Sequence, residues 1–308
     1  MGLDQLQPLT DMQSLRLYSH TDAGLLHLKD LTNLRTLHLN GDYDGSGLVH
    51  LRDLKSLRLL SLGGKFNGSG LENLSELKNL ENLRIVSGSF NGAGLEHLQR
   101  LKGLKSVTLG GNVPDTALLN LKGLPNLQHL NLGGNISDGV LKHLPELKNL
   151  QTLSLGSNFT NEGLLYLQEA SSLRSLTFYG NDKFTDEGLV HLRGLTNLHE
   201  LTLCDSGFTD AGMVHLMGLP NLEALVIYGE KFTGSGLQQL QGLPSLSSLH
   251  TGGANLTDDQ LVHLEKLTSL STLALGEGVT DAGLVHSAPS RVLHCRRKEQ
   301  VGSHVGRL

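Results

Sequence analysis

The feature that most constrains this chain is a segment that it repeats many times. Residues 184–203 read FTDEGLVHLRGLTNLHELTL, and close variants occupy residues 159–178 and 208–227. Repeats of this length stack in a line, because one repeat alone cannot bury its apolar side. We therefore predict one array of about 12 units over residues 1–286, although 308 residues would ordinarily suggest about two domains. The central apolar residue of each L-x-x-L-x-L stretch, which we call the anchor, recurs every 22 to 25 residues at Leu15, Leu37, Leu60, Leu83, Val107, Leu130, Leu153, Leu176, Leu201, Leu225, Leu249 and Leu273.

Each repeat contains two apolar patterns of different period. In residues 198–203 (LHELTL) the last leucines alternate with a polar residue, as they do in a short strand. In residues 188–195 (GLVHLRGL) leucine recurs at every third position, which predicts one apolar stripe on a short helix. A Thr-Asp pair such as Thr185-Asp186 precedes the helix and offers oxygen atoms to the N–H groups of its first turn.

Nearly all phenylalanines occupy one column of the repeat, just before the Thr-Asp pair. One ring per repeat is typical of an apolar spine inside a stack, so we expect no cofactor to bind at these rings. The column contains Phe66, Phe90, Phe159, Phe184, Phe208 and Phe232.

The pattern [F/V]TDxGLxHLxxLxxLxxLxL over residues 3–286 resembles leucine-rich repeat proteins. It is similar to bacterial leucine-rich repeat arrays and to the cysteine-type repeats of F-box substrate receptors. The resemblance implies an α/β solenoid, a horseshoe with a parallel concave sheet and short convex helices. It also implies a non-catalytic scaffold that recognises a protein partner. The alternative that it implies is a substrate-receptor adaptor for ubiquitin transfer whose F-box part is missing from this chain.

Composition narrows the choice of partner and compartment. A net charge of −5 and a pI near 6.3 give no support for binding nucleic acid. No stretch reads as a signal peptide or a membrane span, and two cysteines cannot form a disulfide framework. We therefore expect a soluble cytoplasmic protein without membrane contact. The sequence does not define its oligomeric state.

One slot on the flank of the helix contains histidine in eight of thirteen repeats. Its substitutes are Asn, Gln and Tyr, which share the hydrogen-bonding capacity of imidazole but not its affinity for metals. Helices of neighbouring repeats are also too far apart for two rings to share a zinc ion at ~2.0–2.1 Å. We expect these side chains to hydrogen-bond the backbone of a neighbouring repeat and predict no metal site. The histidines are His27, His50, His97, His143, His191, His215, His263 and His286.

The inner face of the predicted sheet is built from the residues that flank the anchors, and the main candidate binding group lies on three successive strands. Half of the 24 positions on either side of the anchors are Ser or Thr, so most of this face carries little information. Aromatic residues beside charges are typical of interface hot spots. The predicted partner-binding group is Tyr179, Glu200, Thr202, Cys204, Asp205 and Tyr228, and a smaller basic group is Arg16, Tyr18, His38 and Arg84. The alternative is a solvated sheet with no partner at either place.

No catalytic constellation emerges from the repeat pattern. Cys204 and His199 are five residues apart in one strand and should point to opposite faces, so we expect no nucleophilic pair. No enzymatic activity is therefore predicted.

The two ends depart from the repeat. Residues 287–308 carry five basic residues and one glutamate, and we predict a basic, non-repeat tail that either folds over the last unit or is a disordered arm. Solenoids need polar end units, and neither end of this chain supplies one. The sequence therefore suggests part of a longer array, which sequencing of the flanking DNA would test.

Overall fold

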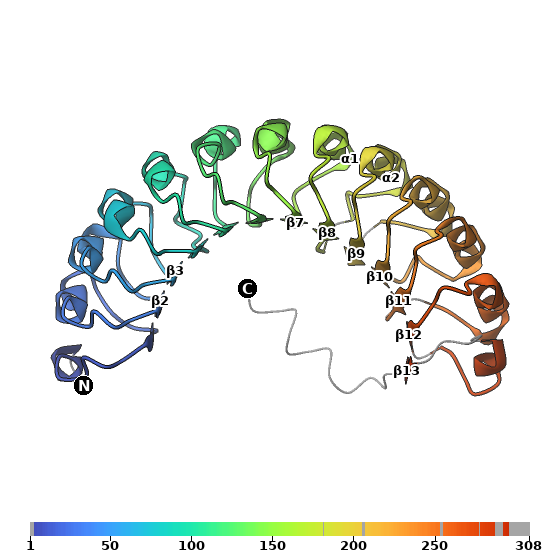
Figure 1. The fold of residues 1–308 in the computed structure, drawn as a ribbon, viewed down its shortest axis with the longest axis horizontal. Coiled ribbons are helices and arrows are strands. Elements are labelled where there is room, and N and C mark those ends of the chain that lie inside the picture. Colours follow the sequence, from blue (N-terminus) through green and yellow to red (C-terminus); the bar gives the residue numbers. More distant parts are fainter. Residues whose placement is uncertain are drawn as a thin grey trace. The chain divides into compact units, whose positions relative to one another are not determined.

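The computed structural model describes residues 3–180, 182–204, 207–252, 255–276, 278–286 and 292–295. The chain divides into two compact units, unit 1 (residues 1–150) and unit 2 (residues 151–308). Each unit repeats a strand, a turn and a short helix, with the strands in one layer and the helices in another (Figure 1). We call the sheet face that is turned away from the helices the inner face.

Unit 1 begins with a short helix and then alternates strands with helices. Each strand pairs in parallel with the next one along the chain, so the anchors align; Leu37, for example, lies opposite both Leu15 and Leu60. The elements are η1 (Leu3–Leu6), β1 (Ser14–Leu17), η2 (Ala23–Leu28), β2 (Thr36–Leu39), η3 (Ser46–Leu51), β3 (Leu59–Leu62), η4 (Leu71–Glu76), β4 (Asn82–Ile85), η5 (Leu95–Arg100), β5 (Ser106–Leu109), η6 (Asp115–Asn120), β6 (His129–Leu132) and η7 (Asp138–Glu146).

Unit 2 continues the same alternation, again with parallel pairing of consecutive strands. Its elements are β7 (Thr152–Leu155), α1 (Asn161–Leu164), η8 (Leu165–Glu169), β8 (Ser175–Phe178), α2 (Asp186–Leu189), η9 (Val190–Gly194), β9 (Glu200–Cys204), η10 (Asp210–Gly218), β10 (Ala224–Tyr228), η11 (Ser235–Gly242), β11 (Ser248–Thr251), η12 (Asp258–Lys266), β12 (Thr272–Leu275), η13 (Gly283–His286) and β13 (Val292–Cys295).

Strand β13 lies within the segment that the sequence analysis sets apart as a tail. It pairs in parallel with β12, and Leu293 stands opposite the anchor Leu273. Leu293 follows Leu273 by 20 residues, which is shorter than the other steps between anchors, so the spacing did not predict it. The remaining residues of this segment lie outside the described part of the chain, and their assignment as a basic tail stays a prediction.

Most of the short helices are 3₁₀ helices. The leucine spacing explains why 3₁₀ helices form. A 3₁₀ helix has three residues per turn, so leucines at every third position lie directly above one another and form one straight apolar stripe. In unit 2, the α-helical turns α1 and α2 are each one turn long and run directly into η8 and η9.

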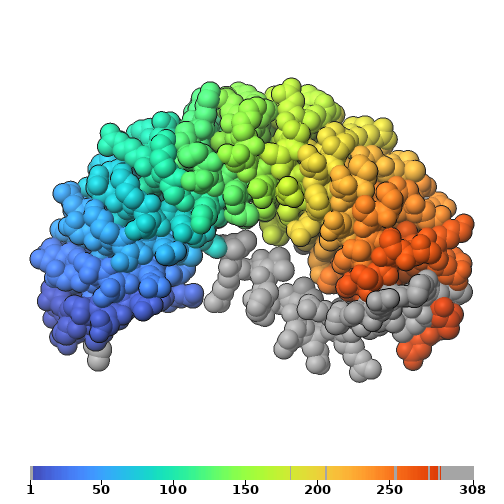
Figure 2. Space-filling view, in the orientation of Figure 1, coloured from blue at the N-terminus to red at the C-terminus, as the bar shows by residue number. Residues whose placement is uncertain are grey.

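The leucine columns form the core of each unit, as predicted. Every anchor from Leu37 to Leu273 is at most 1 % exposed, whereas Leu15 in the first strand is half-buried. Burying one leucine side chain contributes about 1.5–3 kcal/mol, so the columns supply most of the driving force for stacking. In the space-filling view, the repeats within each unit pack against one another without gaps (Figure 2).

The aromatic column forms the predicted spine, with two members that sequence reasoning missed. Phe66 and Phe90 stack with ring centroids 5.9 Å apart. Tyr43 continues this stack at 5.9 Å from Phe66, and His20 lies 4.5 Å from Tyr43. His20 thus occupies the core position where later repeats place phenylalanine, although imidazole is polar.

The aspartate of the Thr-Asp pair binds the next repeat. Asp210 accepts hydrogen bonds from the backbone N–H groups of Thr233, Gly234 and Gly236 at 3.0, 2.9 and 2.8 Å. It also accepts one from the Thr233 hydroxyl at 2.7 Å. At Thr209 the threonine caps its own helix as predicted, since its hydroxyl accepts from Ala211 N–H at 3.2 Å. At Thr185 the prediction was wrong, because this side chain makes no capping hydrogen bond.

A second set of side chains points the opposite way along the array. The asparagine of the L-x-N-L stretch donates from its amide to a backbone carbonyl of the preceding repeat, at 2.7–3.1 Å. The sequence analysis assigned no role to this column. It contains Asn33, Asn79, Asn126, Asn149, Asn197 and Asn221.

Replacing Asp210 with asparagine should lower the free energy of unfolding by about 1–3 kcal/mol at neutral pH. Burial disfavours ionisation of Asp210, but the hydrogen bonds from Gly236, Thr233 and Gly234 outweigh it and hold the pKa of this carboxyl below its usual range. The carboxylate therefore stabilises the fold above the pKa of the unfolded chain, and this contribution is lost as the pH falls through the folded pKa.

Urea unfolding at pH 7 and at pH 3 measures both effects. The difference between Asp210→Asn and the unmodified protein should shrink at pH 3. Asp259→Asn is the matched control, because the exposed Asp259 accepts no hydrogen bond among the described residues. Equal losses of unfolding free energy in the two variants would contradict the stabilising role of the hydrogen bonds between Asp210 and the next repeat.

Candidate partner-binding surface

Three neighbouring strands of unit 2 place the predicted binding residues on one face. In the register of β9 and β10, Cys204 lies opposite Tyr228 and Glu200 lies opposite Ala224. Between β8 and β9, Thr177 lies opposite Thr202, so Tyr179, two residues later, comes level with Cys204. Side chains two residues apart in a strand share a face. The row Tyr179, Cys204 and Tyr228 therefore crosses the inner face at the carboxyl ends of the strands.

Tyr179 is held firmly at the start of this row. Its backbone N–H donates to the Leu155 carbonyl at 2.9 Å, and the next N–H, of Gly180, donates to the Cys204 carbonyl at 3.1 Å. Burial and the neighbouring Cys204 raise the pKa of Tyr179, against opposing hydrogen bonds with Ser154 and Thr177. The phenol is thus protonated at neutral pH and keeps a hydroxyl that can donate to a partner.

Tyr228, at the end of β10, is held by a side chain of the following strand, β11. Its hydroxyl lies 3.2 Å from His250 Nε2, and the two rings are 5.4 Å apart. Gly252 leaves the space for this ring, since a Cβ at that position would overlap Cε1 of Tyr228. A half-buried tyrosine with a restrained ring loses little conformational entropy on binding, which favours it as an anchor.

The charge of the surface lies at the opposite ends of the strands. Glu200 is exposed at the start of β9, and the exposed Glu223 directly precedes β10. Neither carboxylate forms an ion pair among the residues that the structure describes. The exposed Arg174 precedes β8 on the other side, so a cation lies in the same row as Glu223 among the described residues.

Five of the six predicted residues are thus assigned to this face by strand order and register. The sixth, Asp205, lies outside the described residues. The exposed Glu223 stands two residues before its anchor, in a column that the sequence analysis did not consider. The sequence analysis also did not identify His250 as the partner of Tyr228, although His250 directly follows its anchor and was therefore expected on the same face of the sheet.

The groups needed for nucleophilic chemistry are not brought together here. His199 Nδ1 lies 2.6 Å from the Asn197 carbonyl, so the ring is fixed before β9 begins. Cys204 is at the other end of the same strand, about 16 Å further along at ~3.3 Å per residue. Cys204 carries a half-buried thiol.

The histidine slot makes contacts that differ from the prediction. The His191 Nδ1 atom lies 2.8 Å from Gln168 Nε2, and His215 Nδ1 lies 2.9 Å from a guanidinium nitrogen of Arg193. Both partners are side chains of the preceding repeat, so the expected bond to a neighbouring backbone was wrong at these positions. Since amide and guanidinium nitrogens only donate, Nδ1 accepts, and burial together with Arg193 lowers the pKa of His215. No group of three potential metal-binding side chains occurs within the described ranges.

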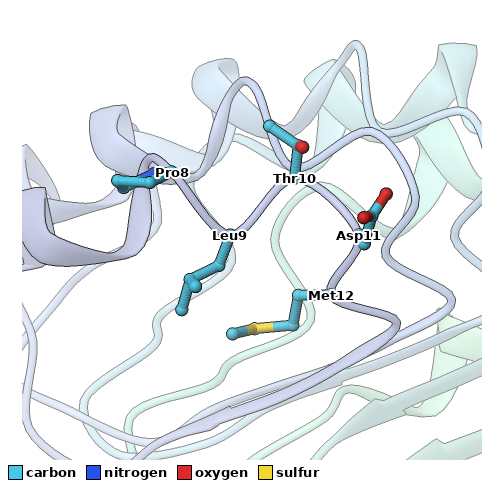
Figure 3. A pocket seen from close by; sticks show the side chains of 5 residues that line it. All are labelled: Pro8, Leu9, Thr10, Asp11 and Met12. Atoms are coloured by element: carbon cyan, nitrogen blue, oxygen red, sulfur yellow. The ribbon is translucent and has the colours of Figure 1, made fainter.

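Two shallow pockets lie in unit 1. One is lined by the consecutive residues 8–12, where Leu9 and Met12 point to one side and Thr10 and Asp11 point away from them (Figure 3). The other is lined by the glycine-rich turns after β4, β5 and β6, including Ser87, Asn112 and Asn135. Neither contains a cluster of titratable groups.

Comparisons with known proteins agree on the fold. The crystal structure of an internalin (inlF) from Listeria monocytogenes matches with a TM-score of 0.59 and 23 % identity, covering 89 % of this chain and 83 % of that one. The crystal structure of the TLR13–ssRNA13 complex matches with a TM-score of 0.59 and 20 % identity, and the match covers 94 % of this chain and 47 % of the TLR13 chain. The crystal structure of the yeast Rad7 and Elc1 complex matches with a TM-score of 0.57 and 18 % identity, and the match covers 91 % of this chain and 81 % of the matched chain.

Two further comparisons bear on identity and setting. The search of curated proteins found no match. Within the described part of the chain, no helix has the length and apolar character that crossing a membrane requires. The family profile described as "Leucine-rich repeat region" matches residues 11–288. This chain therefore belongs to the leucine-rich repeat family.

Proposed function

We propose that this protein is a non-catalytic scaffold that binds a protein partner on the inner face of unit 2. The observation that carries the proposal is the row Tyr179, Cys204 and Tyr228, in which two restrained tyrosines flank a thiol on adjacent strands. Interface hot spots are enriched in tyrosine, and the carboxylates Glu200 and Glu223 add a charge that selects a basic partner. The leucine-rich repeat fold, which serves as a recognition scaffold, supports the same reading.

A displayed library of random peptides, selected on the full chain, tests the proposal. Peptides selected on the unmodified protein should lose about 30-fold or more in affinity for Tyr179→Ala and Tyr228→Ala, as expected for hot-spot residues. Fluorescence anisotropy of labelled peptides measures the change, and circular dichroism checks that each variant is folded.

Tyr166→Ala is the matched control. Tyr166 is also a partly exposed tyrosine of unit 2, but it belongs to η8 in the helix layer. It should leave the affinity unchanged. If Tyr166→Ala weakens binding and Tyr228→Ala does not, the partner binds the helices and the proposal is wrong.

Several narrower expectations stay predictions. None of the structural observations bears on the adaptor role in ubiquitin transfer or on a cytoplasmic location. The absence of nucleic acid among the partners also stays a prediction, supported by the net charge of −5. A non-catalytic role is supported by the separation of His199 from Cys204 along β9.

A further inference from the structure

The inner face of unit 1 differs in charge from that of unit 2. Arg16, His38 and Arg84 lie at one level of the sheet, on β1, β2 and β4. Burial lowers the pKa of His38, and the positive charges of Arg16 and Arg84 lower it further. Neither arginine forms an ion pair within the described residues of unit 1.

A second level of cations lies just before the strands. Arg58 N–H donates to the Arg35 carbonyl, Glu81 N–H to the Arg58 carbonyl, and Lys105 N–H to the Glu81 carbonyl, at 2.8–2.9 Å. These four residues are therefore consecutive neighbours across the sheet. Glu81 is shared between Arg58 at 3.3 Å and Lys105 at 3.1 Å. The two levels together hold five cations and one carboxylate.

We propose that this basic inner surface of unit 1 binds a carboxylate-rich, extended segment of a protein partner, with Arg16 and Arg84 pairing with its acidic side chains. The surface is separate in sequence from the tyrosine row of unit 2, and its charge is opposite to that of Glu200 and Glu223. It therefore adds a second binding chemistry to the proposed scaffold.

The spacing of the cations fits such a segment. Neighbouring strands are ~4.8 Å apart, so β1 and β4, three steps apart, place Arg16 and Arg84 about 14 Å from each other. An extended peptide advances ~3.3 Å per residue, so acidic residues at positions i and i+4 are about 13 Å apart. Arg35 and Lys105 are also three steps apart, which gives the second level the same span. Guanidinium groups bind carboxylates in a bidentate geometry, so each pairing is directional.

The surface favours carboxylates over a nucleic-acid backbone. Unit 1 as a whole is almost neutral, with 15 basic and 14 acidic residues, so it lacks the long-range field that attracts polyanions. Binding of single strands also relies on aromatic platforms for the bases. The single tyrosine beside this surface, Tyr18, is 73 % exposed and stacks on no other ring among the described residues.

Fluorescence anisotropy with a labelled decaglutamate peptide tests the proposal on the full chain, at 50 mM and 150 mM salt. The peptide should bind with a dissociation constant below ~1 mM at 50 mM salt and more weakly at 150 mM. The double variant Arg16→Gln/Arg84→Gln should weaken binding at least tenfold. Lys142→Gln, which removes an exposed cation from η7 in the helix layer, should leave it unchanged.

Glu81→Gln provides a test with the opposite sign. It removes the carboxylate that competes for Arg58 and Lys105, so it should tighten peptide binding several-fold, which damage to the fold would not do. No binding at 50 mM salt, or no effect of the double variant, would overturn the proposal. Tighter binding of a ten-nucleotide thymidine oligonucleotide, lost in the double variant, would reassign the surface to nucleic acid.

The proposal and the function proposed for unit 2 fail separately. Tyr179→Ala and Tyr228→Ala should leave decaglutamate binding unchanged. The variant Arg16→Gln/Arg84→Gln should in turn retain the peptides that depend on the tyrosine row.

Discussion

Gly45→Ala is expected to lower the free energy of unfolding by about 2–5 kcal/mol. Gly45 has φ = 115°, where an L side chain is strained by roughly 1–2 kcal/mol. A Cβ at this position would also overlap the Ser69 carbonyl oxygen and approach Phe66 Cε2 to 2.5 Å. Forcing an extra carbon into a packed core adds about 1–3 kcal/mol. Guanidinium unfolding, followed by circular dichroism, measures the loss.

Gly88→Ala is the matched control for this prediction. Gly88 belongs to the same unit, its φ is not in the left-handed region, and no heavy atom lies within 4 Å of a Cβ built on it. This substitution should change the stability by less than about 0.5 kcal/mol. If Gly45→Ala and Gly88→Ala were equally stable, the fold would not require a glycine where the turns approach each other at Gly45.

His20→Phe is expected to stabilise the protein by about 1–3 kcal/mol at neutral pH, because a buried polar group without partners is costly. His20 is 6 % exposed, and neither of its ring nitrogens has a hydrogen-bond partner within the described residues. Phenylalanine occupies the same column in later repeats and would continue the stack formed by Tyr43 and Phe66.

The advantage of His20→Phe should grow as the pH falls. Burial lowers the pKa of His20, with Asp22 opposing it, so below about pH 6.5 the unfolded chain binds more protons than the folded one. The stability of the unmodified protein is therefore lost progressively as the pH falls from 6.5 towards the folded pKa. Tyr43 and the backbone of Gly41, which also pack on the ring, do not titrate in this range.

Urea unfolding between pH 8 and pH 5 measures this dependence. His129→Gln, which replaces an exposed histidine on β6, is the control and should leave the slope with pH unchanged. An unchanged slope in His20→Phe as well would show that His20 does not titrate on unfolding.

The fold was predictable because every repeat gives the same information again. The column from Leu37 to Leu273 predicted both the core and the register of the strands, since a slip by one residue would expose these leucines. Burial of leucine at every third position also explains the 3₁₀ helices, although the sequence analysis predicted only short helices. Strand β13 was missed because Leu293 comes too early for the repeat length.

The side-chain contacts between repeats were harder to predict. The sequence assigned Asp210 to its own helix, yet the carboxylate reaches the next repeat, which depends on the lateral distance between stacked turns. The same distance decides that His191 contacts Gln168 and not a backbone group. For the binding surface, the columns beside the anchors identified Glu200 and Thr202, and the tyrosines and Cys204 were recognised three residues after their anchors. The column of Glu223 and Arg58, two residues before the anchor, was not considered.

The hydrogen bonds of the aspartates to the next repeat and of the asparagine amides to the preceding repeat have a genetic consequence. Each such bond joins a repeat only to its immediate neighbour, as Asp186 does with Thr209 and Asp210 with Thr233. Duplicating or deleting one whole repeat, such as residues 186–209, leaves every junction with a donor and an acceptor. A deletion of half a repeat breaks both sets at once. Unequal crossing-over in steps of 22 to 25 codons is therefore the change in length that this architecture tolerates best.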